Sequence, residues 1–459
     1  MSQGETFSKT KKIIIAMVDI FLFHLAILFS FYIQFKDNIP DYNFVAYTSS
    51  FVYIMAVFVF LNILFGVYIL YNKSLIDFLY ITIIIQVIMT IAIMAVTFAG
   101  RWFTFPRSVL IYTLISSTIF LFIWRAIVYK MYVKFNGTKQ VMLVGTKEKV
   151  HSAFQNFAEA KNERHKVKIV VVANYFENIK AHIDEIDIIY LASQMDEDER
   201  IKIYELLIRK EKKIFLNTSF ENIVMVNPNI MNIEDESIIE ISDFKIPGED
   251  DFIKRMVDII FATILILVTS PIMLITAFLV KITSKGPAFY SQVRITKDGK
   301  EFNILKFRSM AATAERDSGP VLASSSDARV TTIGRYLRAL RIDELPQLFN
   351  VLKGEMSVVG PRPERPFFVD QFQEQNPAYY LRHNVRAGIT GYAQVYGKYA
   401  SDFNSKLNFD LIYIKKYSFF LDAKIMLQTI KILFDKVSSK GLEDENALKE
   451  IPKEMIILD

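Results

Sequence analysis

Four long apolar stretches at the start of the chain constrain its fold most strongly. They cover residues 13–35, 44–70, 78–99 and 109–128. Each has about 20 residues or more, enough for a helix to cross the roughly 30 Å hydrocarbon core of a bilayer. The first is too long for the apolar core of a signal peptide and does not end in small residues. We therefore predict four spanning helices.

The remainder of the chain is much more polar. Charged residues make up about 11% of the first 130 residues and about 27% of the rest, and 459 residues are enough for about three folded units. The absence of cysteine excludes disulfides, thiolate zinc sites and CxxC redox chemistry, and the five histidines are scattered. A net charge of +5 is too small to indicate nucleic acid, so a lipid surface is the expected anionic neighbour.

Basic residues at the ends of this region predict its orientation. They precede the first helix at Lys9, Lys11 and Lys12, and follow the fourth at Arg125, Lys130, Lys134 and Lys139. Because the helix number is even, both flanks are expected in the cytoplasm; Arg101 and Arg107 fit this less well. Asp19 and His24 lie inside the first stretch, where we expect one at the interface and the other paired with a neighbouring helix, rather than a functional pair.

A fifth apolar run covers residues 259–280 and is interrupted by Ser270-Pro271. Proline removes a helical hydrogen bond, and serine can satisfy the carbonyl that this leaves free. Basic residues stand at both ends, in Lys254-Arg255 before the run and at Lys281 after it. The run could span the bilayer, or it could enter and return on one side. We favour the re-entrant alternative because it keeps the following residues in the cytoplasm.

Between these apolar regions, short β-branched runs alternate with helix-permissive segments, as in a small parallel α/β unit. The runs are residues 141–144, 167–173, 186–192 and 213–217. The first ends at a lone Gly145 and not at a GxGxxG sequence, which leaves little room for a dinucleotide. We therefore favour a structural or regulatory unit over a cofactor-binding one.

Two adjacent carboxylates, Asp343 and Glu344, are flanked by arginines at 338, 341 and 362. One interpretation is only a capped amphipathic helix, with Asp343 as N-cap, Pro346 in the first turn and Gly354 at the end. The other is a phosphoryl-transfer centre. Arginines neutralise phosphate oxygens, one carboxylate can hold Mg²⁺, and the other can attack phosphorus. Pro361 and Pro363 would hold Arg362 in place.

Other positions are less specific. Lys306 and Arg308 fit phosphate binding or the solvent face of a strand equally well. Gly388 and Gly391 are interpreted as turn glycines, and His383 and Arg386 stay unassigned. Three aspartates, Asp402, Asp410 and Asp422, are expected to be satisfied polar groups. The tail, residues 441–459, is predicted to be an accessory helix or a loose terminus.

Several motifs together resemble the bacterial sugar transferase family, the polyprenyl-phosphate glycosylphosphotransferases. In chain order they are Lys254-Arg255 with Asp258, Ser270-Pro271, residues 306–310, Asp343-Glu344-Leu345-Pro346-Gln347, residues 360–363 and residues 388–395. The resemblance covers roughly residues 252–435. The whole chain looks like the long form that primes exopolysaccharide, capsule or O-antigen synthesis, with a Rossmann-like domain before the catalytic one.

The resemblance implies transfer of a sugar 1-phosphate from a UDP-sugar to undecaprenyl phosphate, with release of UMP. It makes Asp343 the nucleophile of a covalent phosphosugar intermediate and Glu344 the Mg²⁺ ligand. Arg338 would bind phosphate and Arg362 the nucleotide. The residues Lys254, Arg255 and Asp258 would position a re-entrant helix at the membrane interface. Large members of the family are commonly homodimers.

The expected fold is therefore a membrane protein in four parts. They are a transmembrane bundle (1–133), a Rossmann-like domain (134–248), a mixed α/β catalytic domain (249–440) with a re-entrant helix (252–281), and a tail (441–459). The catalytic domain would lie on the cytoplasmic face of the inner membrane. A membrane-bound nucleotide-sugar dehydratase or epimerase is a competing hypothesis that lacks its glycine signature. A non-enzymatic scaffold for polysaccharide export is another.

Overall fold

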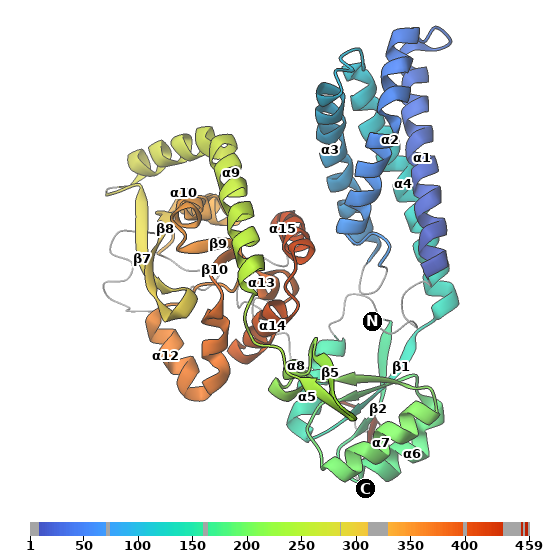
Figure 1. Cartoon of the computed structure of the whole chain (residues 1–459), viewed down its shortest axis with the longest axis vertical. Helices are drawn as coiled ribbons and strands as arrows, with labels where there is room; N and C mark the ends of the chain where they lie inside the picture. Colours follow the sequence, from blue (N-terminus) through green and yellow to red (C-terminus); the bar gives the residue numbers. More distant parts are fainter. Residues whose placement is uncertain are drawn as a thin grey trace. The chain divides into compact units, whose positions relative to one another are not determined.

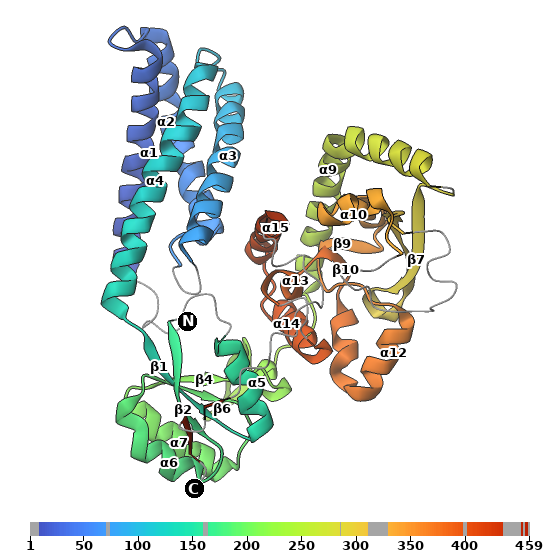
Figure 2. The same cartoon turned by 180° about the vertical axis from the view of Figure 1, so that it is seen from behind.

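The computed structural model forms two compact units (Figures 1 and 2), Met1–Asn217 with Ala447–Asp459, and Thr218–Asn446. It describes residues 9–69, 74–158, 164–284, 286–310, 329–397, 402–434, 451–452 and 455–457. The contacts thus group residues 218–248 with the second unit, although the sequence analysis assigned them to the middle domain.

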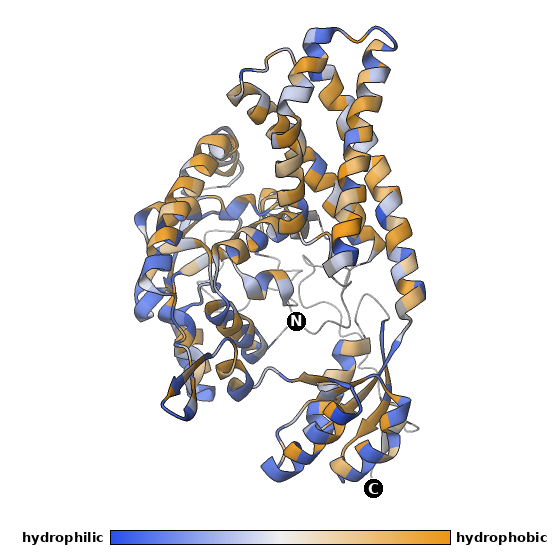
Figure 3. Ribbon diagram, turned by 45° about the vertical axis from the view of Figure 1, so that its right-hand side comes forward, coloured by the Kyte–Doolittle hydropathy of each residue, from blue (hydrophilic) through white to orange (hydrophobic). Residues whose placement is uncertain are grey.

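The first unit begins with the predicted apolar helices: α1 (Lys9–Phe35), α2 (Asp41–Leu64), α3 (Leu75–Ala99) and α4 (Arg107–Asn136). By length and composition, all four could cross a membrane, as could α9 (Gly248–Thr283) in the second unit. Figure 3 shows the apolar character along these helices. α2 ends six residues before the predicted stretch does, because the chain turns at Gly66, whose φ is 61°.

A polar cluster from all four helices lies inside this bundle. The Arg125 guanidinium donates to Asp19 (3.0 Å) and Thr82 (2.8 Å) and also bonds Asn62. Arg125 is 3% exposed and Asp19 is fully buried, so Arg125 is not the flanking cation that the sequence predicted. His24 bonds the Tyr47 hydroxyl of α2. The expectation that one of Asp19 and His24 is paired with a neighbouring helix is therefore confirmed for Asp19, and His24 also has a partner on a neighbouring helix; the position of His24 at the interface stays a prediction.

We predict that Asp19→Ala lowers the thermal stability of the purified protein strongly, because it leaves the Arg125 charge buried without a counter-ion; such losses are about 3–5 kcal/mol. The double variant Asp19→Ala/Arg125→Ala should lose less than the two single losses added together. Melting curves in one detergent measure both effects. Ser50→Ala is the matched control, because Ser50 is buried but bonds only carbonyls of its own helix. Additive losses would contradict the pairing.

The rest of the first unit is a parallel sheet in the order β11-β2-β1-β3-β4. Four strands form where the sequence predicts them: β1 (Lys139–Val144), β2 (His165–Val171), β3 (Ile188–Leu191) and β4 (Lys213–Leu216). Residues of α5 (Lys147–Ala158) pack in one apolar cluster of the sheet, and residues of α6 (Tyr175–His182) and α7 (Glu197–Arg209) pack in another. The η1 turn (Ile183–Glu185) follows α6. The designation Rossmann-like stays a prediction.

The end of the chain returns to this sheet. Ile456 and Ile457 form β11 (Ile456–Ile457), which pairs in parallel with Val170 and Val171 of β2. Ile451 and Met455 pack on the apolar cluster that α5 also covers. Within the predicted tail, the structure describes only residues 451–452 and 455–457, and of these Ile456 and Ile457 extend the edge of the sheet at β2. The rest of the predicted tail lies outside the described residues.

The second unit is a mixed α/β fold built on α9. Its strands are β5 (Asn229–Ile233), β6 (Glu236–Glu240), β7 (Phe289–Ile295), β8 (Glu301–Phe307), β9 (Met356–Val359) and β10 (Ala387–Thr390). Its α-helices are α8 (Phe220–Val224), α10 (Thr332–Ala339), α11 (Gln347–Lys353), α12 (Pro366–Gln375), α13 (Tyr392–Tyr396), α14 (Phe403–Lys415) and α15 (Phe419–Phe434). Its 3₁₀ turns are η2 (Lys297–Gly299), η3 (Ile342–Glu344) and η4 (Pro377–Asn384). The main core joins α9 to α11, β9, α14 and α15.

The helix α9 consists of two arms joined by a sharp bend (Figures 1 and 2). Pro271 lies inside it, and proline is the usual cause of such bends. Pro271 has no N–H for the carbonyl of Leu267, and the Ser270 hydroxyl donates to that carbonyl at 2.8 Å. The predicted role of the Ser270-Pro271 pair in the backbone is therefore confirmed.

Both arms of α9 pack on the same α/β unit. In the first arm, Lys254 pairs with Asp422 of α15, and the Asp258 carboxylate accepts a hydrogen bond from the Val358 N–H at 3.0 Å. In the second arm, Met273 and Val280 pack with Phe307 and Leu337. Apolar side chains near the bend point away from the unit, and Leu267 and Val268 are 69% and 68% exposed.

Candidate active site

Asp343 and Glu344 lie in the η3 turn between α10 and α11. The turn follows Arg341, whose φ of 56° is in the left-handed region, so the chain reverses sharply there. The prediction that Asp343 caps the helix is wrong, because α11 begins later, with Pro346 as its N-cap. The predicted end at Gly354 is confirmed by its φ of 87°.

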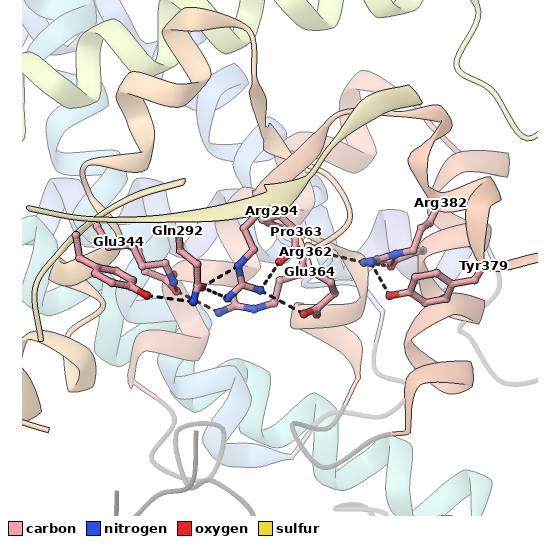
Figure 4. A network of polar contacts seen from close by, with 11 residues as sticks. Gln292, Arg294, Glu344, Arg362, Pro363, Glu364, Tyr379 and Arg382 are labelled. Atoms are coloured by element: carbon pink, nitrogen blue, oxygen red, sulfur yellow. Dashed lines mark hydrogen bonds and ion pairs between the residues drawn. The ribbon is translucent and has the colours of Figure 1, made fainter. Parts of the chain in front are cut away.

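Glu344 is surrounded by three cationic side chains, of which Figure 4 labels Arg362. Its carboxylate lies 3.4 Å from Arg362 Nη2, 3.6 Å from Lys306 Nζ and 3.7 Å from Arg341 Nη1. Burial alone would raise the pKa of Glu344, but these cations lower it to about 2. Glu344 is therefore ionised at any physiological pH.

The neighbouring Asp343 has a different environment. Its side chain is buried, and no described residue forms a hydrogen bond or ion pair with its carboxylate. Burial raises the pKa of Asp343 to about 6, and the negative charge of Glu344 adds to this effect. Arg338 lies near enough to lower that pKa, as Lys306 and Arg341 also do. Two adjacent carboxylates thus have pKa values about four units apart, which is typical of groups with different chemical roles.

Lys306 and Arg308 on and after β8 have different positions. Lys306 turns toward Glu344, and burial lowers the pKa of its ammonium. Of the two alternatives left open, the solvent-facing strand is therefore wrong for Lys306. Arg308 is 5% exposed and donates to the carbonyl of Ser284 at 2.9 Å and to its hydroxyl at 2.6 Å, just after α9.

The backbone around Arg362 is fixed residue by residue. The carbonyls of Pro361, Arg362 and Pro363 accept hydrogen bonds from the Gly388 N–H (2.9 Å), Arg382 (2.8 Å) and Arg294 (3.1 Å). Figure 4 shows the two donors, Arg382 at the carbonyl of Arg362 and Arg294 at the carbonyl of Pro363. The sequence analysis missed both. Pro361 and Pro363 are buried and frame Arg362.

Asn350 is a second residue that sequence reasoning missed. It is fully buried on α11 and bonds both the N–H of Leu305 (3.0 Å) and the carbonyl of Asn303 (2.8 Å). It therefore fixes β8 beside α11, which brings Lys306 next to the turn that carries Glu344. The signal in the sequence was an amide residue among the apolar residues of the helix that follows the acidic pair, since a buried amide needs hydrogen-bond partners.

The glycines predicted to lie in turns have a different role. Gly388 lies in β10, and a β-carbon there would come within 2.1 Å of the Gly360 nitrogen. A β-carbon at Gly391 would come within 2.1 Å of the Gly360 carbonyl oxygen. These glycines permit the close backbone approach that places Pro361–Pro363 against β10.

The remaining predicted residues lie outside the carboxylate cluster. Arg255 donates to the carbonyl of Leu352 at 2.8 Å and caps the end of α11. Lys254 and Asp258 bind α15 and β9, so their predicted position at a membrane interface stays a prediction. Asp410 pairs with Arg382 and Asp422 with Lys254, which confirms that both are satisfied polar groups.

The residues present fit a single Mg²⁺ ion held by Glu344 together with a phosphate substrate. In the described ranges, no three acidic or histidine side chains gather. Mg²⁺ in proteins commonly takes only one or two carboxylates and completes its shell with phosphate oxygens and water. Glu344 is ionised, and the cations around it complement phosphate oxygens that would share the metal.

We predict that Asp343→Asn stabilises the protein at neutral pH. The folded pKa of Asp343, about 6, lies above the ordinary value of 3.8, so the cost of ionisation to the folded state builds up between these pH values and is complete above pH 6. The amide removes this penalty of about 3 kcal/mol, and the gain should shrink as the pH is lowered toward 5. Melting temperatures of wild type and variant between pH 5 and 8 measure it.

Glu344→Gln is the control with the opposite sign. Its folded pKa of about 2 lies below the ordinary 4.5, so ionisation stabilises the folded state at neutral pH and the amide should lower stability. Equal shifts for the two variants would contradict the opposed environments.

Comparison with known proteins identifies a family for the part of the chain that carries this site. Residues 249–436 match the family model of the bacterial sugar transferases. A UDP-N-acetylgalactosamine-undecaprenyl-phosphate N-acetylgalactosaminephosphotransferase of Aeromonas hydrophila is 49% identical over 185 residues, 40% of this chain and 44% of the relative. A UDP-glucose:undecaprenyl-phosphate glucose-1-phosphate transferase of Klebsiella pneumoniae is 36% identical over 252 residues, 53% of this chain and 54% of the relative.

The chain thus spans about half the length of these curated relatives. An uncharacterized sugar transferase of Bacillus subtilis is 41% identical over 194 residues, which are 42% of this chain and 92% of that protein. Nearly the whole of this relative is therefore matched by a part of this chain. The chain belongs to the bacterial sugar transferase family.

Proposed function

We propose that this protein transfers a sugar 1-phosphate from a UDP-sugar to undecaprenyl phosphate and releases UMP. The observation that carries the proposal is the acidic pair, in which Asp343 is buried without a hydrogen-bond or ion-pair partner among the described residues and Glu344 is surrounded by three cations. The Aeromonas and Klebsiella relatives are, by name, transferases that act on a UDP-sugar and undecaprenyl phosphate. The reaction would prime exopolysaccharide, capsule or O-antigen synthesis at the cytoplasmic face of the bacterial inner membrane.

In the first step, a carboxylate oxygen of Asp343 attacks the phosphorus that carries the sugar. The bond from this phosphorus to the bridging oxygen breaks, and UMP leaves with that oxygen. A covalent aspartyl-phosphosugar remains. Asp343 suits this role because a carboxylate with a pKa of about 6 is mostly ionised at neutral pH and lacks a partner that would hold it back.

In the second step, a phosphate oxygen of undecaprenyl phosphate attacks the same phosphorus. The bond to Asp343 breaks, which regenerates the carboxylate and forms the undecaprenyl-diphosphate-sugar. Lys306, Arg341 and Arg362 neutralise phosphate charge in both steps, and the fixed backbone of Arg362 keeps its guanidinium aligned. Mg²⁺ bound at Glu344 would supply further charge neutralisation.

We also propose that α9 is re-entrant and brings this site to the lipid headgroups. Straight, its 36 residues would extend about 54 Å, and its ends could not both reach one domain. Instead, Asp258 in the first arm and Val280 in the second both pack on the α/β unit. The exposed apolar side chains at the bend fit one leaflet.

We predict that the protein is labelled covalently when it is incubated with a UDP-sugar carrying ³²P in the sugar-linked phosphate, without lipid acceptor. Neutral hydroxylamine should release the label, because it cleaves acyl phosphates. Asp343→Asn should carry no label and release less than 1% of the wild-type UMP, because the attacking oxygen is lost. Gel autoradiography and UMP assays measure both.

Asp370→Asn is the control, because Asp370 is an exposed carboxylate of the same unit and should label like wild type. Glu344→Gln should retain Asp343 but lose the Mg²⁺ dependence of UMP release. Full turnover by Asp343→Asn, or hydroxylamine-resistant label, would overturn the mechanism. A dehydratase, an epimerase or a scaffold would give no label at all.

The absence of cysteine allows a direct test of the α9 topology. We predict that exposed Glu249→Cys and Lys281→Cys, at the two ends of α9, react with a membrane-impermeant maleimide from the cytoplasmic side only. Asn38→Cys, between α1 and α2, should react only from the opposite side. Reaction of the two α9 positions from opposite sides would contradict the re-entrant topology.

A further inference from the structure

Arg382 is a buried charge that has no place in the proposed chemistry. It lies in η4 and is 4% exposed. Its Nε and Nη2 atoms lie 2.9 and 2.8 Å from the Asp410 carboxylate, and Nη1 donates to the Tyr379 hydroxyl at 2.9 Å. A charge buried this deeply is retained at a cost in desolvation, which calls for an explanation of its presence.

A further bond of Arg382 leads to the candidate active site. Nη2 of Arg382 donates to the main-chain carbonyl of Arg362 at 2.8 Å (Figure 4). The Arg362 side chain in turn reaches Glu344 at 3.4 Å. The two arginines therefore interact through a carbonyl, with one guanidinium buried and the other directed to the acidic pair.

The contact between the Arg382 guanidinium and the Arg362 carbonyl can fix the position of Arg362. A guanidinium is planar, so the bonds to Asp410 and Tyr379 fix the direction in which Nη2 points. Pro361 and Pro363 restrict the backbone on both sides of Arg362. A fixed donor that holds the carbonyl between two prolines determines where the Arg362 side chain begins.

We propose that Arg382, held by Asp410, is a positioning residue that acts through the carbonyl of Arg362. It touches neither substrate nor the reacting atoms, and its effect on the reaction passes through the Arg362 guanidinium. This inference rests on the proposed transferase function for its activity readout, although the contact itself does not.

A double-mutant cycle tests the proposal. Arg382→Lys keeps the charge but loses the planar group, and it should lower kcat/KM for UMP release about ten- to hundredfold, since small misplacements of binding groups have effects of this size. In an Arg362→Ala background the same substitution should change kcat/KM less than twofold, because the group it positions is gone. A merely structural role would give equal effects in both backgrounds and would overturn the proposal.

Two further variants keep the result decisive. Asp410→Asn weakens the anchor of Arg382 but leaves the donor to Arg362, so it decides the matter if Arg382→Lys does not fold; it should show the same dependence on Arg362. Arg386→Lys is the matched control, because Arg386 pairs with Asp251 at 2.8 Å in the same unit. Its effect should be the same with and without Arg362.

The same cycle on equilibrium binding of UDP separates this inference from the proposed function. Arg382→Lys should weaken UDP binding in the wild-type background and leave it unchanged in the Arg362→Ala background. Coupled binding without any turnover would refute the transferase function and support the positioning role. Turnover together with additive effects of the two substitutions on UDP binding would support the transferase function and refute the positioning role.

Discussion

The ion pairs between Glu344 and its three cations are the interaction on which the site depends. Lys306 comes from a β-hairpin, Arg341 from the turn before the acidic pair, and Arg362 from the segment after β9. One carboxylate thus gathers three parts of the chain. Because the group is buried, each cation is attracted more strongly than it would be in water, and removal of any of them leaves charge unbalanced.

The same cluster explains why Asp343 differs from its neighbour. The cations pair with Glu344, and for Asp343 burial and the adjacent negative charge outweigh the weaker effect of the nearby cations. Its ionised form is therefore disfavoured in the folded protein. A carboxylate in such an environment reduces stability, and the cations around Glu344 offset that loss within the same turn. A destabilising carboxylate beside stabilising ion pairs is expected at sites selected for chemistry.

The bent helix α9 belongs to the same unit as this site. Its first arm is tied to the core through Lys254 and Asp258, and its second arm packs beside the residues that precede the acidic pair. The apolar side chains at the bend stay outside the unit. The element that the sequence marks as a membrane segment is therefore also part of the fold that carries the carboxylates.

Much of the architecture follows from local sequence. The apolar lengths of the four helices, the proline at 271 with its serine, the β-branched strands, and Gly354 at the end of α11 are all local features, because helix length, backbone hydrogen bonding and positive φ depend on neighbouring residues. The acidic pair and Arg362 could also be identified in advance, since phosphoryl chemistry requires these residue types close together.

Only the tertiary structure decided which distant side chains meet. Asp19 and Arg125 pair across 106 residues, so a residue that seemed to flank the membrane lies inside the bundle. Lys306 faces Glu344 because Asn350 fixes β8, and Arg382 and Arg294 hold the carbonyls at Arg362 and Pro363. The last strand joins a sheet that began over 300 residues earlier. Such partners are set by packing between segments, which no local pattern records.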